Sequence, residues 1–449
     1  MPKVSKHLNA ANLIDQVCKC LDEIPDHRPN HCPNGIPFPN FAKSAFAMMH
    51  QKYDSLLTFD SDRADPVILH NLATMYHVQD QKVPCDTRMR EVLDPIEPAQ
   101  FRKPFKKLFS LIQRNKLLKA FEYQCGDLKD WYLMPVDGTG LFYSGKCRCQ
   151  ECCVKNKGKP NEAYYHNLLG GCIVHPDQKV VMPFAPEAIV QQDGDNKNDC
   201  EQNAIKRYLA HVKREHPHLK LVILLDGLFA DNPTIELIKS YGWHFIIVAK
   251  DGNHKSLIEA MDALCDQEQL SYHKIIDEEQ GTRHWFRFAN DVPLNASKLT
   301  QNVNVLDYVE TDSEGKRHTW CWVTDIELTK DTVEAVMRGG RCRWHIENQT
   351  FNTLKNQGYS LEHNYGHGKQ HLATNLAYLT FLAFMVDQIQ EMASPEFKKA
   401  LKERARGVRT YLWKVITRVF LSWMLEGWDE LFDALIYGIK PGRVQINTS

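Results

Sequence analysis

The middle of the chain carries two short runs in which nearly every position is apolar. LKLVILLDG spans residues 219–227, and WHFIIVAK spans residues 243–250. Runs without polar alternation are typical of strands that are buried on both faces of a helix-covered sheet. A helical pattern over residues 232–241 lies between the two runs. The order strand, helix, strand therefore predicts a unit of an α/β core.

Strand-like runs of another kind flank this unit. Before it, WYLMPVDGTGLFY (131–143) indicates strand, turn and strand, and runs at 164–175 and 179–190 extend a predicted antiparallel meander. After it, aromatic and β-branched runs fill much of residues 254–335. Because these runs interrupt the α/β rhythm, we expect them to form a β-rich insertion.

Helical patterns dominate both ends of the chain, residues 1–127 and 371–449. The most apolar helical stretch, Leu376–Val386, is well short of the ~20 residues that a membrane span needs. We therefore expect it to be a buried helix, and we expect no membrane contact. A further helix is expected after the insertion, with an interruption at Gly339 and Gly340.

These patterns divide the chain into five segments. They are a helical region (1–127), the first part of the core with a cysteine-rich loop at 146–166 (128–253), the insertion (254–335), a core helix (336–370) and a C-terminal helical region (371–449).

The composition is that of an ordinary globular protein. Of 449 residues, 43% are hydrophobic and 25% are charged, and the formal net charge is -1. Any contact with DNA must therefore come from local basic faces. The helical stretch 102–119 is such a face, on which Lys106, Lys107 and Arg114 are candidate DNA-binding residues. A solvated basic helix face without a partner is the alternative. Because no apolar signal segment opens the chain, its 14 cysteines indicate a reducing compartment and not a disulfide scaffold.

Three acidic residues stand where a divalent metal ion could be bound. Asp137 lies in the strand-like run, Asp226 ends the apolar run LKLVILLD, and Glu347 lies on a helical segment. An unpaired carboxylate at the end of a buried strand is costly, so it needs a metal ion, an Arg partner or a solvent-facing edge. The plainer explanations are a tight turn at Asp137, a helix cap at Asp226 and a solvated ion-pair face at Glu347.

The helix that carries Glu347, expected over Arg341–Asn356, adds two basic residues. Arg343 shares a helix face with Glu347, and Lys355 lies about 80° further round the helix. One acid with two bases fits a metal ligand that is flanked by phosphate-binding groups.

The sequence around these residues resembles the DDE transposases of bacterial insertion sequences. The resemblance rests on VDGTG, LLDGLFADNP and RWHIENQTFNTLKNQGYSLEHNYGHG, and it covers about 128–390. In the branch with a β-rich insertion before the last acid, the Glu helix follows the pattern Tyr, two residues, Arg, three residues, Glu, six residues, Lys. Arg343 and Glu347 fit this pattern, whereas Gly340 stands at the Tyr position and Lys355 lies one residue late.

The resemblance implies a ribonuclease-H-like core and a two-metal reaction on DNA. Asp137, Asp226 and Glu347 would be catalytic and bind two Mg²⁺ ions, which Mn²⁺ can replace, and Arg343 and Lys355 would contact phosphates. Water would cut at the terminal inverted repeats of the element, and the freed 3′-OH would attack target DNA. A homodimer on DNA at the cytoplasmic nucleoid of a bacterium is a further expectation, with residues 1–127 as the region for DNA-end binding and dimerisation. The alternatives are a nuclease that does not join ends and a DNA-binding descendant without catalysis.

A cysteine-rich loop follows Asp137. Its candidate ligands for a structural Zn²⁺ are Cys147, Cys149, Cys152 and the nearby His166, since thiolates and imidazoles suit a tetrahedral zinc site. The spacing, with Cys153 adjacent to Cys152, is not the standard paired knuckle, so free thiols or a redox-active pair are alternatives. Three histidines further along are expected in a loop or facing DNA: His363, His367 and His371.

Overall fold

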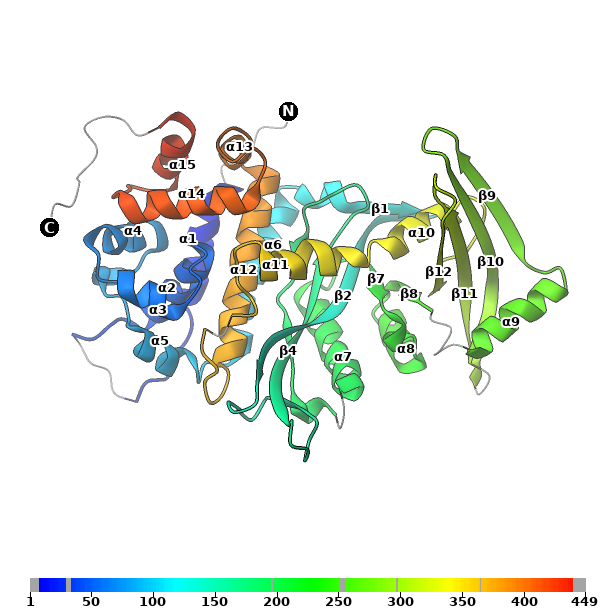
Figure 1. Ribbon diagram of the computed structural model, residues 1–449, viewed down its shortest axis with the longest axis horizontal. Coiled ribbons are helices and arrows are strands. Elements are labelled where there is room, and N and C mark those ends of the chain that lie inside the picture. Colours follow the sequence, from blue (N-terminus) through cyan, green and yellow to red (C-terminus); the bar gives the residue numbers. More distant parts are fainter. Residues whose placement is uncertain are drawn as a thin grey trace.

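The computed structural model describes residues 8–29, 34–194, 197–249, 255–295, 298–363 and 365–438. A long mixed sheet runs through it in the strand order β3-β4-β2-β7-β8-β12-β11-β10-β9. Figure 1 shows this sheet beside a helical part that is built from both ends of the chain. The predicted α/β class is confirmed.

The core combines antiparallel and parallel strands. Its strands are β1 (Glu122–Cys125), β2 (Leu128–Ser144), β3 (Cys153–Lys155), β4 (Ala163–Ile173), β5 (Met182–Pro183), β6 (Glu187–Ile189), β7 (Leu221–Leu225) and β8 (His244–Val248), and its helices are α7 (Lys197–Glu215) and α8 (Asn232–Ser240). β2 pairs antiparallel with β1 and β4 but parallel with β7, which pairs parallel with β8. α8 supplies the crossover that two parallel strands need. This arrangement is that of a ribonuclease-H-like core.

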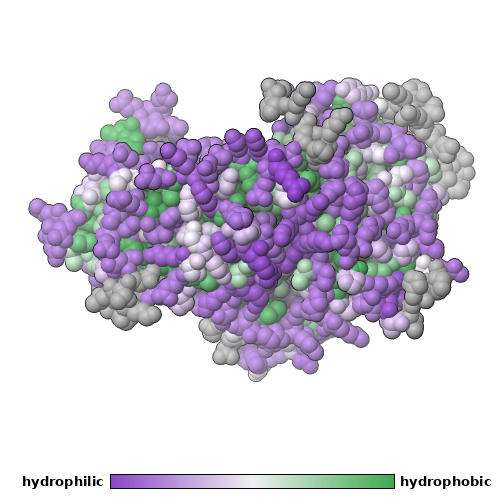
Figure 2. All heavy atoms as spheres, turned by 180° about the vertical axis from the view of Figure 1, so that it is seen from behind, coloured by the Kyte–Doolittle hydropathy of each residue, from purple (hydrophilic) through white to green (hydrophobic). Residues whose placement is uncertain are grey.

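The strands after β8 extend the same sheet. They are β9 (Ser271–Asp277), β10 (Thr282–Asn295), β11 (Lys298–Thr311) and β12 (Arg317–Thr324), preceded by α9 (Lys255–Asp266). They pair antiparallel with one another, and β12 pairs with β8, where Trp322 lies opposite Val248. Seen from behind, the surface is largely hydrophilic, and hydrophobic areas are larger toward the end that carries these strands (Figure 2).

The helix after the insertion, α10 (Val333–Arg341), runs through Gly339 and Gly340 without a break. The interruption expected there is wrong, because these glycines serve close packing. A Cβ on Gly340 would lie 2.6 Å from the ring of Trp322, and one on Gly339 would lie 3.1 Å from Ile246. α10 ends at Arg341, and a turn at Cys342 and Arg343 follows. The helix expected over Arg341–Asn356 is therefore not continuous: its later part is the π-helical turn η7 (Ile346–Phe351), which leads into α11 (Asn352–Asn356).

One helix from the C-terminal region organises the helical part. The helices there are α1 (Ala10–Asp22), α2 (Phe38–His50), α3 (Leu56–Asp62), α4 (Pro66–Tyr76), α5 (Asp86–Leu93), α6 (Arg102–Arg114), α12 (Leu372–Ala393), α13 (Pro395–Lys399), α14 (Arg409–Ser422) and α15 (Trp428–Tyr437). α12 stands between the N-terminal helices and the sheet (Figure 1). Within the described residues it alone is long and apolar enough to cross a membrane, but 94% of its most apolar window is buried. The prediction of a buried helix at Leu376–Val386 is confirmed.

A buried carboxylate on α12 holds the two ends of the chain together. Asp387 lies 2.7 Å from Lys52 Nζ and 3.3 Å from His50 Nε2, and it accepts a hydrogen bond of 2.6 Å from the Tyr359 hydroxyl. The Lys52 ammonium also lies 4.5 Å from the ring centroids of Tyr359 and Trp413. Since Asp387 is only 2% exposed, its charge depends on these partners.

We expect Asp387→Ala to lower the free energy of unfolding by about 3–5 kcal/mol, because removing one member of a buried ion pair leaves the other charge buried without compensation. Urea denaturation followed by circular dichroism measures this change. The control is Glu91→Ala, which removes an exposed ion pair with Arg88 and should cost less than about 1 kcal/mol. Equal effects of the two substitutions would contradict the importance of the buried network.

Candidate active site

Two of the three predicted acids lie close to the point where the pairing of β2 with β7 ends. In the parallel pair of β2 and β7, Pro135 lies opposite Leu224. Asp137 stands two residues further along β2, which continues to Ser144, and Asp226 directly follows the last residue of β7. Adjacent strands are about 4.8 Å apart, so the same register places the two acids side by side.

Short hydrogen bonds fix both carboxylates locally. Asp137 accepts a bond of 2.8 Å from the N–H of Gly138, and Asp226 accepts one of 2.7 Å from the N–H of Leu228. Asp226 caps the helical turn that follows β7, as the plainer explanation of this residue supposed. Capping does not exclude a metal role, since a carboxylate has two oxygens and about four lone-pair sites.

The third acid reaches the sheet from the π-helical turn η7. η7 packs against β2 and β4. The ring of Phe351 lies over Gly170, where a Cβ would be only 2.7 Å from it, and Gly170 pairs with Asp137 across the strands. A π-helical turn of this kind occurs frequently at functional sites. It presents Glu347 beside Asp137.

An arginine lies between two of the acids. Arg343 Nη1 is 2.9 Å from Asp137 Oδ2, and Arg343 Nη2 is 3.0 Å from Glu347 Oε1. The Arg343 side chain is only 11% exposed, against 26% for Asp137 and 36% for Glu347. In this structure the guanidinium is therefore the positive charge that balances the two carboxylates.

The surroundings raise the pKa of Asp137 from 3.8 to about 6. Burial is the largest cause, and the nearby Glu347 carboxyl adds to it. The Arg343 charge and the Gly138 N–H act in the opposite direction but do not cancel the effect. Two carboxyl groups so close together favour a further cation.

Comparison with known proteins identifies the family. A sequence model of the family described as "Transposase DDE domain" matches residues 153–385. The chain belongs to this family of transposases. No curated protein matches the chain. The matched segment contains Asp226 and Glu347 and begins after Asp137, and membership makes the protein an enzyme that acts on DNA.

The acids of this DDE transposase suit the divalent ions that its family uses. Mg²⁺ takes oxygen ligands and keeps several of its waters, so a few carboxylates are enough to hold it. The carboxylates of Asp137 and Glu347 both lie within 3.0 Å of the Arg343 guanidinium. The fold thus places two negative charges around one positive charge. The donor set therefore fits Mg²⁺.

The predicted phosphate-binding residues have different surroundings. Lys355 Nζ forms an ion pair of 2.7 Å with Glu362 and is 23% exposed. On α6, Lys106, Lys107 and Arg114 are all exposed. α6 packs against α1 and α12, so these three cations belong to the helical part of the transposase.

The structure brings a second group of ligand atoms together. Single atoms of Cys149, Cys152, His166 and His367 all lie within 4.8 Å of one another, and these residues could hold a metal ion. Cys147, which we expected in this set, is exposed and is not part of the group. Cys153 is turned away, with its thiol 3.7 Å from the carbonyl oxygen of Ile189.

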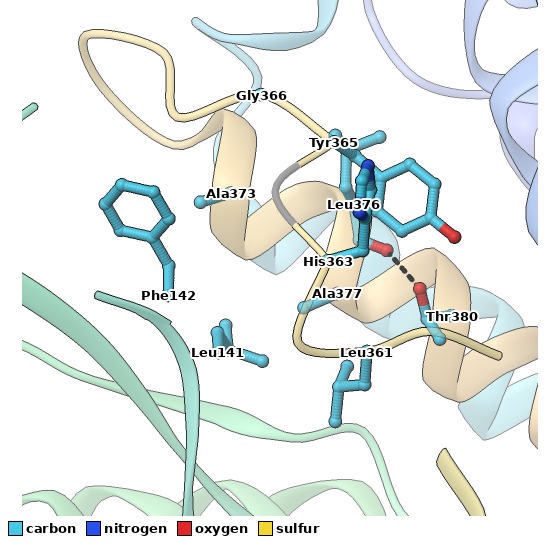
Figure 3. Close-up of a pocket in the computed structure, with 10 residues that line it drawn as sticks. All are labelled: Leu141, Phe142, Leu361, His363, Tyr365, Gly366, Ala373, Leu376, Ala377 and Thr380. Atoms are coloured by element: carbon cyan, nitrogen blue, oxygen red, sulfur yellow. Dashed lines mark hydrogen bonds between the residues drawn. The ribbon is translucent and has the colours of Figure 1, made fainter. Parts of the chain in front are cut away.

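Sequence reasoning missed the fourth member of this group. His367 was expected in a loop or facing DNA, and the glycines on either side of it hid its role. The other two histidines of this segment have different surroundings. His371 lies 2.7 Å from Glu151, and His363 lines a small cavity of about 30 Å³ together with Leu141 and Phe142 (Figure 3).

In buffer without divalent ions, we expect Asp137→Asn to stabilise the protein above pH 6. The folded carboxyl has a raised pKa, so the folded state holds a proton that the unfolded state has lost between about pH 4 and pH 6. Stability therefore falls as the pH rises through this window, and Asn removes that loss. A pKa raised from 3.8 to about 6 corresponds to a gain of up to about 3 kcal/mol in the free energy of unfolding at pH 8, and this gain should vanish below pH 4.

Urea denaturation in EDTA at a series of pH values measures this difference. The exposed Asp127→Asn is the control, and it should change stability by less than about 0.5 kcal/mol. A gain for Asp137→Asn that is the same at pH 4 and pH 8 would show that the carboxylate charge is not its cause.

Proposed function

We propose that this transposase cuts DNA at the terminal inverted repeats of its own insertion sequence and joins the freed 3′ end to target DNA. Asp137, Asp226 and Glu347 serve as the ligands of two Mg²⁺ ions, which Mn²⁺ can replace. The observation that carries the proposal is that the carboxylates of Asp137 and Glu347 both pair with the Arg343 guanidinium. Asp226 follows β7, the parallel neighbour of the strand that carries Asp137.

The acids hold their positions through the sheet and through η7. When bound, two divalent ions activate the attacking oxygen and stabilise the leaving oxygen of a phosphodiester. The hydrogen bonds from Gly138 and Leu228 keep Asp137 and Asp226 oriented before any ion arrives. Such preorganisation lowers the reorganisation needed at the moment of reaction.

Arg343 changes partners in this proposal. In the structure its guanidinium is paired with Asp137 and Glu347. If these carboxylates held divalent ions, the guanidinium would lose its attraction to them and would turn outward. There it meets the phosphates of the DNA, for which its planar fork is suited. Lys355 releases Glu362 in a similar way and contacts a neighbouring phosphate.

The helical part supplies contacts with the DNA end. The exposed Lys106, Lys107 and Arg114 neutralise phosphates and make binding depend on salt. Recognition of the repeat sequence comes from contacts with base edges in the same region. The protein works as a homodimer on DNA, as is common in proteins that bind two related ends.

We expect Asp137→Ala, Asp226→Asn and Glu347→Gln each to lower the rate of cleavage by more than about 100-fold. Losses of this size are seen when one group that stabilises the transition state is removed. End binding should persist, because the basic residues remain. Labelled DNA from the ends that flank the gene, incubated with Mg²⁺ or Mn²⁺ and a target plasmid, measures nicking and joining together.

The matched control is Glu334→Gln, an exposed acid on α10 that should leave both reactions unchanged. Nicking without joining by the parent protein would replace the proposal with a nuclease that does not transfer strands. End binding without nicking in either metal would indicate a DNA-binding descendant. Cleavage by Asp226→Asn at the parent rate would remove the three-acid site.

A triple substitution on α6 tests the basic face. We expect Lys106→Ala, Lys107→Ala and Arg114→Ala together to reduce the slope of log K against log[salt] by about one for each phosphate that the protein no longer neutralises. Fluorescence anisotropy with end DNA at a series of salt concentrations measures this slope. The control removes the same charge from other exposed positions: Lys239→Ala, Lys316→Ala and Lys330→Ala. An equal reduction of the slope in both triple variants would contradict a specific role for α6.

A further inference from the structure

We infer that Cys149, Cys152, His166 and His367 bind one Zn²⁺ ion, and that this ion fastens the basic loop after β2 to the segment that leads into α12. The site is separate from the three acids, and it does not depend on whether they cut DNA. Its ligands come from two parts of the chain, since the first three lie in residues 149–166 and His367 comes about 200 residues later.

Five of the six distances between the ligand atoms lie within about 0.5 Å of those in a tetrahedron around zinc, and the sixth is below 4.8 Å. With Zn–S of about 2.3 Å and Zn–N of about 2.05 Å, ideal edges are about 3.8 Å between sulfurs, 3.3 Å between nitrogens and 3.6 Å for mixed pairs. The two sulfurs are 3.7 Å apart and the two Nε2 atoms are 3.3 Å apart. The mixed distances that involve His166 are 3.3 and 3.4 Å, and Cys152 Sγ lies 3.1 Å from His367 Nε2.

A disulfide does not explain the group. The sulfurs of Cys149 and Cys152 are far beyond the S–S length of about 2.05 Å. A disulfide would also leave the two imidazole nitrogens facing each other without a role. Two thiols and two imidazoles directed at one centre form instead one of the common ligand sets of structural zinc.

Contacts behind the ligands hold them in place. The other ring nitrogen of His367, Nδ1, lies 3.0 Å from the carbonyl oxygen of Gly368, as is usual for a histidine that binds a metal through Nε2. The Phe142 ring packs against His367, with centroids 4.8 Å apart. The N–H of Cys149 also points at Cys152 Sγ, 3.4 Å away. These contacts orient the ligands toward a common centre.

The ion would join two segments that meet near the end of β2, where Phe142 pairs with His166, five residues along the strand from Asp137. One is the loop after β2, the strand that carries Asp137, and the other follows α11 and continues to α12. The loop bears five exposed cations, Lys146, Arg148, Lys155, Lys157 and Lys159. Mutual repulsion of these charges works against an ordered loop. Coordination to zinc would hold the loop in place against this repulsion, and the loop would then present a fixed basic surface to DNA phosphates.

The metal content of the purified full-length protein tests the site. We expect about one zinc per chain by mass spectrometry of the metal, and its loss in Cys149→Ser and His367→Gln. Each substitution should weaken zinc binding by more than about 100-fold, since loss of an outer partner alone costs 10- to 100-fold. Cys147→Ser is the matched control in the same loop and should keep the ion. Glu347→Gln should keep it too, which separates this site from the acids.

Two further measurements keep the test decisive if a variant folds poorly. Co²⁺ added to the metal-free parent protein should give the absorption bands of a tetrahedral site with sulfur ligands. A zinc chelator should make trypsin cleave the loop at its lysines at least about tenfold faster, because the ion no longer holds it. Less than one zinc after refolding with Zn²⁺, or unchanged affinity in His367→Gln, would overturn the inference. Equal zinc loss in Cys147→Ser would do the same.

Discussion

The parallel pairing of β2 with β7 is the constraint on which the candidate active site depends. Its register places Pro135 opposite Leu224, and so sets Asp137 beside Asp226. A slip of one residue would turn one of these side chains to the other face of the sheet, because side chains alternate along a strand. Every residue of β7 is completely buried. A slip would therefore force both faces of a close-packed core to repack at once, and the core thus protects the alignment of the acids.

The second constraint is electrostatic. The Glu347 carboxyl lies close enough to Asp137 to help raise its pKa, and Arg343 is the positive group that pairs with both in the folded protein. The fold thus brings these acids together, although the ionised form of Asp137 carries a cost. Functional sites commonly retain such costs, because a fully relaxed arrangement of charges would have no reason to bind a cation.

Features that depend on neighbouring residues could be predicted from the sequence, whereas contacts between residues far apart in the chain could not. The end of an apolar run pointed to Asp226, because a buried strand that ends in a carboxylate is unusual. Asp137 was recognised as well, but the turn expected there is wrong, because it lies within the continuous strand β2 and pairs with Gly170. Periodicity also predicted the buried helix that became α12. Gly340 was misread, because the preference of glycine for breaks competes with its use in close packing, and only the neighbouring Trp322 ring decides between them. His367 could not be linked to a loop about 200 residues earlier, since no local pattern encodes that contact.

The buried network around Asp387 also determines when the helical part can complete its folding as the chain is synthesised. Helices α1 to α6 leave the ribosome long before α12, which packs against α1, α2, α5 and α6 and supplies the partner of Lys52. The helical part therefore cannot complete its core until most of the chain has been translated. A message truncated before residue 372 would yield helices without that cover, which quality-control proteases readily degrade. Damaged copies of such a gene would then leave no stable fragment to compete with the intact protein for DNA ends.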